Sequence, residues 1–185
     1  PVRGLLVSIP EASAAAKGMG MAMLSEDETR TVRRVPFVQR YQEGAWLPFA
    51  VPVVGAFWGV NRGAVAWLGP QQQVKVGEHT IALEKNALWL NYRGPQKTFP
   101  TYSAADLVEH RLPEGALRGK IVLIGVTRLE YDLVRTPFSR APGVEVQATA
   151  IDNVLRGDPM RRSTERFDLL ATLGLGLLVS ALFLF

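Results

Sequence analysis

Residues 117–157 decide the fold that the sequence predicts. They read LRGKIVLIG (117–125), VTRLEYDLVRTPF (126–138) and APGVEVQATAIDNVLRG (141–157). The unbroken apolar run inside Lys120–Gly125 predicts a fully buried strand of the parallel type. The polar residues behind that run predict a loop at the carboxyl end of the strand, and a helix is expected from about Val144 to Arg156.

The predicted helix carries one apolar face, whose members recur at helical spacing and are Val144, Ala148, Ile151 and Leu155. Glycine readily adopts the left-handed backbone of a helix C-cap, so Gly157 is expected to end the helix, and Pro159 prevents its continuation. The next apolar run begins close behind this helix. We therefore predict that the apolar face passes a signal to the chain that follows.

The chain closes with FDLLATLGLGLLVSALFLF (167–185), in which no charged residue follows Asp168. Residues 169–185 number roughly 17, at the short edge of what crosses a bilayer. We predict that they begin a transmembrane helix and that 161–168 form a juxtamembrane linker, with Arg161, Arg162 and Arg166 near lipid headgroups. A buried core helix or hairpin is the alternative. The positive-inside rule favours a cytoplasmic flank here, but long translocated domains often override that rule.

The sequence before residue 117 predicts strands and two further helices. An antiparallel pair is expected from Met19–Leu24 and Val32–Tyr41, and a buried helix from about Pro48 to Gly63. A β-meander is expected over 74–92, and a helix from Ser103 to about His110. Together these patterns predict a mixed α/β fold, in which a sheet has flanking helices and an antiparallel hairpin layer and is followed by the transmembrane helix.

The composition excludes several functions. The 185 residues carry a net charge of +4, with 21 basic and 17 acidic side chains. The basic residues are mostly scattered and do not interleave with aromatic ones, so no nucleic-acid binding is predicted. The absence of cysteine excludes disulfides and thiolate metal sites.

No motif indicates catalysis or a cofactor. Gly119-Lys120 lacks the glycine that a phosphate-binding loop requires five residues earlier, where Glu114 stands. His79 and His110 are far apart in the sequence and predict surface or turn positions rather than a metal pair. We therefore predict no enzyme activity, no cofactor and no metal site in this chain.

Polar side chains at predicted strand ends form the candidate ligand site. They are Thr127, Glu130 and Asp132 after the buried strand, and Asn91 and Arg93 after another strand. In open α/β sheets ligands bind at the carboxyl ends of strands, and a carboxylate there could bind a cationic group. The alternative is that Asp132 bonds loop amides and that Asn91 and Arg93 serve a turn. Asp152 and Asn153 lie in the predicted helix, and they are expected to serve as packing or capping groups.

Several motifs occur in an order that resembles a known family. They are NYRGP (91–95), YSAADL (102–107), LRGKIVLIGVT (117–127) and PGVEVQATAIDNVLRG (142–157). Over roughly residues 15–185 the chain resembles the extracytoplasmic CHASE type 2 sensor domain of bacteria. It departs from the family's pattern where Arg128 follows Thr127 and where Tyr131 precedes Asp132.

The resemblance implies a place for the domain in a longer receptor. Residues 1–160 would be the C-terminal part of an extracytoplasmic, periplasmic sensor domain in the inner membrane, whose N-terminal half lies outside this chain. Membrane helices would lead to a cytoplasmic adenylate or guanylate cyclase, a histidine kinase or a serine/threonine kinase, and such proteins usually work as homodimers. The predicted ligand is an unidentified small molecule. The alternative is a structural or protein-interaction module of an envelope complex, without such a ligand.

Overall fold

The computed structural model describes residues 9–41, 44–61, 64–69, 72–127, 132–161, 163 and 165–183. Its helices are α1 (Pro10–Ala15), α2 (Ala50–Phe57), α3 (Ala104–Val108), α4 (Gly143–Arg156) and α5 (Glu165–Leu182). Its strands are β1 (Ser25–Glu26), β2 (Val32–Pro36), β3 (Gln39–Tyr41), β4 (Gly44–Trp46), β5 (Val65–Leu68), β6 (Gln73–Val76), β7 (His79–Ala82), β8 (Ala87–Trp89), β9 (Leu133–Arg135) and β10 (Arg140–Pro142). The mixed α/β class is therefore confirmed.

The strands form small antiparallel sheets. Within the described ranges the orders are β1-β2-β8, β5-β6-β7, β3-β4 and β10-β9. The predicted meander is present in part, because β6 and β7 pair around Gly77, whose φ is +59°. Its last strand leaves the meander, since β8 pairs with β2, with Leu88 opposite Val35.

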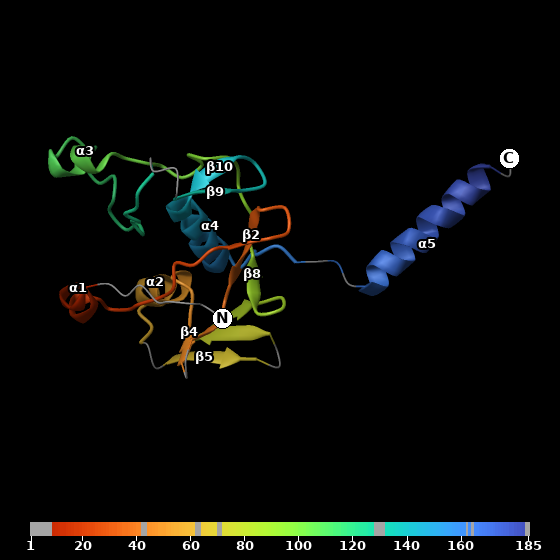
Figure 1. The fold of residues 1–185 in the computed structure, drawn as a ribbon, viewed down its shortest axis with the longest axis horizontal. Coiled ribbons are helices and arrows are strands. Elements are labelled where there is room, and N and C mark those ends of the chain that lie inside the picture. Colours follow the sequence, from red (N-terminus) through yellow and green to blue (C-terminus); the bar gives the residue numbers. More distant parts are fainter. Residues whose placement is uncertain are drawn as a thin grey trace.

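The hydrophobic core lies between α2, α4 and the β2–β8 pair (Figure 1). Val35 and Leu88 of the two strands are fully buried, as is Val54 of α2. On α4 the core side chains are Val146, Ala150, Ile151 and Val154. The predicted face shares Ile151 with this set, whereas Val144, Ala148 and Leu155 are only partly buried. The buried stripe of α4 is thus turned from the predicted one, because Val144 lies against Gly125 and not in the core.

Other boundaries differ from the expected ones. The helix predicted from Pro48 to Gly63 is the shorter α2, and only Ala50, Val51, Val54 and Gly55 of it are buried. The helix predicted after Ser103 is present as α3, where the Ser103 hydroxyl accepts a hydrogen bond from the Ala105 N–H. The strand expected at Met19–Leu24 is reduced to a bridge between Met21 and Pro48, and the pairing with β2 is made by β1.

The buried strand predicted at Lys120–Gly125 was wrong. Residues 121–127 have no regular secondary structure, and no hydrogen bond joins their backbone to the rest of the described chain. Ile121 and Leu123 pack on the core, but Val122, Ile124 and Val126 are 46, 86 and 51% exposed. A buried strand needs strands on both sides, and no described strand lies beside this segment.

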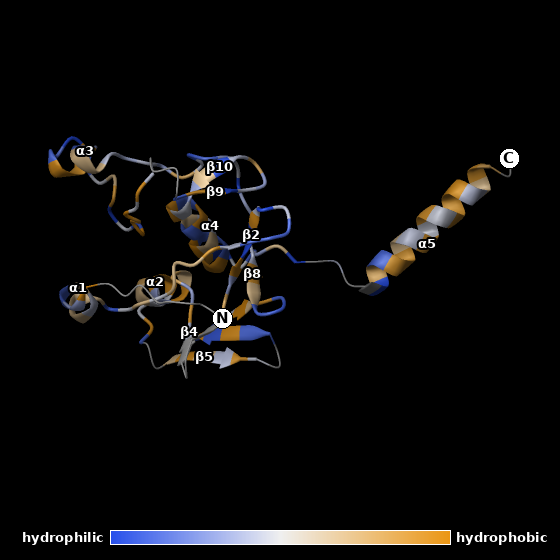
Figure 2. Cartoon of the chain, viewed as in Figure 1, coloured by the Kyte–Doolittle hydropathy of each residue, from blue (hydrophilic) through white to orange (hydrophobic). Residues whose placement is uncertain are grey.

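Helix α5 stands apart from the rest of the described chain (Figure 1). Its side chains from Arg166 to Leu182 are all exposed, and hydrophobic residues run along it beyond a polar first turn (Figure 2). No helix among the described residues combines the length and hydropathy that a membrane span requires. The predicted transmembrane helix is therefore not confirmed in the described part of 169–185.

The turn between β1 and β2 is held by Asp27. Its Oδ1 accepts hydrogen bonds from the Thr29 hydroxyl (2.7 Å), the Thr29 N–H (2.8 Å) and the Thr31 N–H (3.1 Å). Its other oxygen pairs with Arg33. The hydroxyl of Thr29, the N–H of Thr31 and the Arg33 guanidinium all favour the charged carboxylate, so the pKa of Asp27 lies well below its ordinary 3.8.

We expect the Asp27 turn to make the stability of the domain depend on pH in the acid range. A carboxylate with a depressed pKa contributes stability that is complete above its unfolded pKa and is lost as the pH falls below that value. Thermal melting from about pH 6 to about pH 2 should therefore show a smaller acid-induced decrease in Tm for Asp27→Asn than for the parent chain. The control is Glu28→Gln in the same turn, and an unchanged acid slope in Asp27→Asn would contradict the prediction.

Candidate functional site

Asn91 and Asn153 form a pair of reciprocal hydrogen bonds. The Asn153 side chain is fully buried. Its Oδ1 accepts from the Asn91 N–H at 2.8 Å, and its Nδ2 donates to the Asn91 carbonyl at 3.1 Å. The amide of a helix residue thus bonds the backbone beyond β8 as a neighbouring strand would. The Asn91 side chain itself donates to the Asp158 carbonyl at 3.1 Å.

Arg93 lies beside this pair and binds two carboxylates. Its Nε donates to Asp152 Oδ2 at 3.3 Å, and its Nη2 donates to Asp158. Asp152 also accepts from Arg156 at 2.7 Å. The hydrogen bond to Asp158 is the main cause that raises the pKa of Arg93 above its ordinary value.

These contacts fasten the chain that leaves α4. We call residues 158–161 the outgoing segment, because they lead from α4 towards α5. The Met160 N–H donates to the Trp89 carbonyl at 3.0 Å, which ties the outgoing segment to the end of β8. Together, these bonds connect Trp89, Asn91, Arg93 and Asn153 to one another and to the outgoing segment. We call this set of bonds the exit joint.

The predicted ligand residues do not meet in one pocket. Asp132 Oδ1 lies 3.1 Å from the place of a Cβ on Gly143, at the start of α4. Thr127 is exposed, and Glu130 is outside the described residues. Asn91 and Arg93 belong to the exit joint at the other end of α4. Ligand binding by this set stays a prediction.

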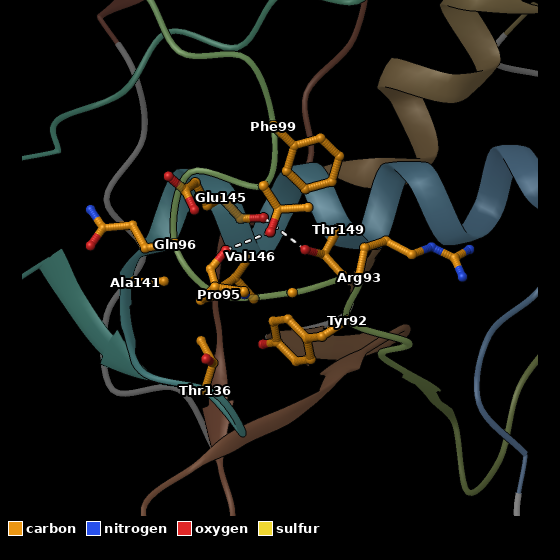
Figure 3. A pocket seen from close by; sticks show the side chains of 12 residues that line it. Tyr92, Arg93, Pro95, Gln96, Phe99, Thr136, Ala141, Glu145, Val146 and Thr149 are labelled. Carbon is orange, nitrogen blue, oxygen red and sulfur yellow. Dashed lines mark hydrogen bonds between the residues drawn. The ribbon is translucent and has the colours of Figure 1, made fainter.

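A small cavity includes Arg93 in its lining but not Asp132. It is lined by Tyr92, Arg93, Gly94, Pro95, Gln96, Thr98, Phe99, Thr136, Ala141, Glu145, Val146 and Thr149 (Figure 3). Its volume is about 10 Å³, so it holds at most one water molecule. Glu145 closes one side by accepting the Lys97 N–H at 3.0 Å. The Tyr92 hydroxyl donates to the Val32 carbonyl at 2.8 Å, and burial raises its pKa.

A larger groove lies on the outer face of β8, where the sequence indicated no site. Its volume is about 220 Å³, and it is lined by Ala82, Leu83, Glu84, Ala87, Trp89, Met160 and Arg161. We call it the Trp89 groove. The alternation of ALWL predicts that Ala87 and Trp89 share one face of the strand. This alternation is the sequence feature that could have indicated the groove. Its other wall comes from the outgoing segment, and no local pattern predicts that contact.

Metal binding has no support in the described ranges, which contain no group of three or more His, Asp or Glu side chains arranged to hold an ion. The two histidines are apart, and His79 stacks on Trp58 with ring centroids 3.7 Å apart.

The family of the chain follows from comparison with family models. The model of the CHASE2 domain matches residues 3–182. The chain therefore belongs to the CHASE2 family, whose members are extracytoplasmic sensory domains without catalytic activity. No curated protein and no solved structure gave a match.

Proposed function

We propose that this domain senses a stimulus outside the membrane and passes it through membrane helices to a cytoplasmic cyclase or kinase. The exit joint is the observation that carries the proposal. It fastens the outgoing segment to β8 and α4, so a change in the sensory domain can alter the position of α5. Such a joint is a two-state element when a stimulus favours one of its arrangements.

The proposal includes insertion of the C-terminal residues in the membrane. The support is the absence of charge from Leu169 onward and the exposure of the apolar side chains along α5. In water these side chains would favour association, because exposed apolar patches of this extent are uncommon on soluble proteins. The periplasmic location, the inner membrane and a homodimeric receptor belong to the same proposal.

A structural or protein-interaction module is the second candidate. The observation that favours it is the exposed apolar set Val122, Ile124 and Val126 in a segment without backbone partners in the described chain. Such a segment offers both apolar side chains and free backbone groups to another protein. On this alternative, changes in the exit joint would leave receptor output unaffected.

The test is the substitution Arg93→Gln in the whole receptor. Removing two partly exposed ion pairs changes the free-energy difference between the two arrangements of the exit joint by about 1 kcal/mol, which is roughly fivefold in their equilibrium. We expect the basal output, measured as cyclic nucleotide or phosphoryl transfer, to change by about that factor. The Tm should change little, because surface pairs contribute little to stability.

Arg111→Gln is the matched control. Arg111 also pairs with two carboxylates, Asp106 and Glu109, but these lie in and just after α3, away from the exit joint. Its substitution should leave the output unchanged. Equal outputs from Arg93→Gln, Arg111→Gln and the parent receptor would reject transmission through the exit joint.

A further inference from the structure

The Trp89 groove has walls contributed by two distant segments, and apolar and polar groups both line it. Leu83, Ala87 and Trp89 come from the β7–β8 region, and Met160 comes from the outgoing segment. Leu88 points to the opposite face and is fully buried in the core. The volume of about 220 Å³ is about seven times the ~30 Å³ that a water molecule occupies in the liquid. This is room for a molecule the size of an amino acid.

Two side chains of opposite charge also line the groove. Arg161 is exposed at the edge of the groove, and its guanidinium offers the paired N–H donors that a carboxylate binds. Glu84 lies in the β7–β8 connection and is partly buried. A carboxylate accepts several hydrogen bonds, so Glu84 can bind an ammonium group in addition to other contacts.

Trp89 supplies a fixed aromatic surface in the groove. The guanidinium carbon of Arg34, directly across the sheet from Trp89, lies 5.9 Å from the centre of the Trp89 ring. This cation–π contact restrains the indole. Aromatic rings bury large apolar groups and pack well against other rings. Met160 adds a flexible side chain that can adapt to the shape of a bound molecule.

We propose that the Trp89 groove binds a small zwitterion with an apolar body, such as a free apolar α-amino acid. Its carboxylate binds Arg161, its ammonium group binds Glu84, and its body lies against Trp89. The ligand then contacts both sides of the Met160–Trp89 hydrogen bond. This inference names the ligand class of the proposed sensor and, for its effect on output, rests on the proposed function.

The test compares three probes that share the same apolar body. They are phenylalanine, 3-phenylpropionate, which lacks the ammonium group, and 2-phenylethylamine, which lacks the carboxylate. Isothermal titration calorimetry of the whole chain in detergent measures each Kd. We expect phenylalanine to bind about tenfold more tightly than either analogue, the usual value of one charged hydrogen bond. Arg161→Gln should remove the tighter binding of phenylalanine relative to 2-phenylethylamine but not relative to 3-phenylpropionate. Glu84→Gln should remove its tighter binding relative to 3-phenylpropionate but not relative to 2-phenylethylamine.

Arg118→Gln is the control, because Arg118 is an exposed arginine outside the groove and should leave all three Kd values unchanged. Absence of heat up to about 10 mM phenylalanine, equal Kd values for the three probes, or equal losses in Arg161→Gln and Arg118→Gln would each overturn the site. Because the measurement needs no output domain, it is independent of signalling. Binding as expected without any effect of Arg93→Gln on output would reject transmission through the exit joint and leave the binding site intact.

Discussion

Replacing Asn153 by alanine is expected to lower the free energy of unfolding by about 3 kcal/mol, because the substitution leaves the N–H and the carbonyl of Asn91 without their side-chain partners in a partly buried place. The cost is that of two unsatisfied backbone groups rather than of lost apolar contact. Urea denaturation measures it as a lower midpoint with an unchanged m-value.

The control for Asn153→Ala is the same change at Asn61, which is exposed in the chain after α2. A surface substitution of this kind should stay within about 0.5 kcal/mol of the parent chain. If Asn153→Ala were as stable as Asn61→Ala, the side-chain amide of Asn153 would not be holding the chain beyond β8.

Replacing Leu88 by alanine is expected to lower the free energy of unfolding by about 2–5 kcal/mol. Leu88 is fully buried in the core, so the substitution loses apolar burial and leaves a cavity. The same denaturation experiment measures the effect. Because Leu88 lies on the face of β8 opposite Trp89, the change tests the core without altering the groove lining.

Leu173→Ala provides the matched comparison. Leu173 of α5 is 55% exposed, so the same atoms are removed from a side chain that buries little surface within the chain. Its expected effect on the unfolding of the domain is below about 0.5 kcal/mol. A similar loss at both leucines would mean that α5 packs on the domain in solution, contrary to its separation in Figure 1.

Helix α4 could be predicted from the sequence because its determinants are local. Apolar residues recur at helical spacing, and Gly157 ends the helix with a φ of +67°. The orientation of its buried face could not be predicted, because that face includes polar side chains with distant partners. Gln147 is 5% exposed and donates to the carbonyl of Ala22, and Asn153 bonds Asn91.

Segment 121–127 shows where the prediction of secondary structure from a local sequence pattern fails. Its run of apolar residues is typical of a buried strand, but burial requires neighbours that the pattern cannot supply. In the described chain only one side of the segment packs, through Ile121 and Leu123. Gly125 allows close approach to Val144, since a Cβ at Gly125 would lie 2.6 Å from Val144 Cβ.

The candidate site was predictable only as a set of residue types. The sequence selected Asn91 and Arg93 as polar groups after a strand, and the structure shows that both bond the far end of α4. Their partners lie about sixty residues away in the sequence, so no spacing rule joins them. The Trp89 groove was missed for the same reason, because Met160 and Arg161 reach β8 only through tertiary folding.

Gly157 has a mechanical consequence for the proposed receptor. Its left-handed backbone, followed by Pro159, ends α4, so α4 and α5 are two separate helices and not one continuous helix. A twist of α4 about its own axis is therefore not delivered to α5 as torque. The hydrogen bond from the Met160 N–H to the Trp89 carbonyl holds the chain after α4 against β8, so in the proposed receptor a displacement of the chain at this bond, rather than a rotation of α4, would be passed on towards α5.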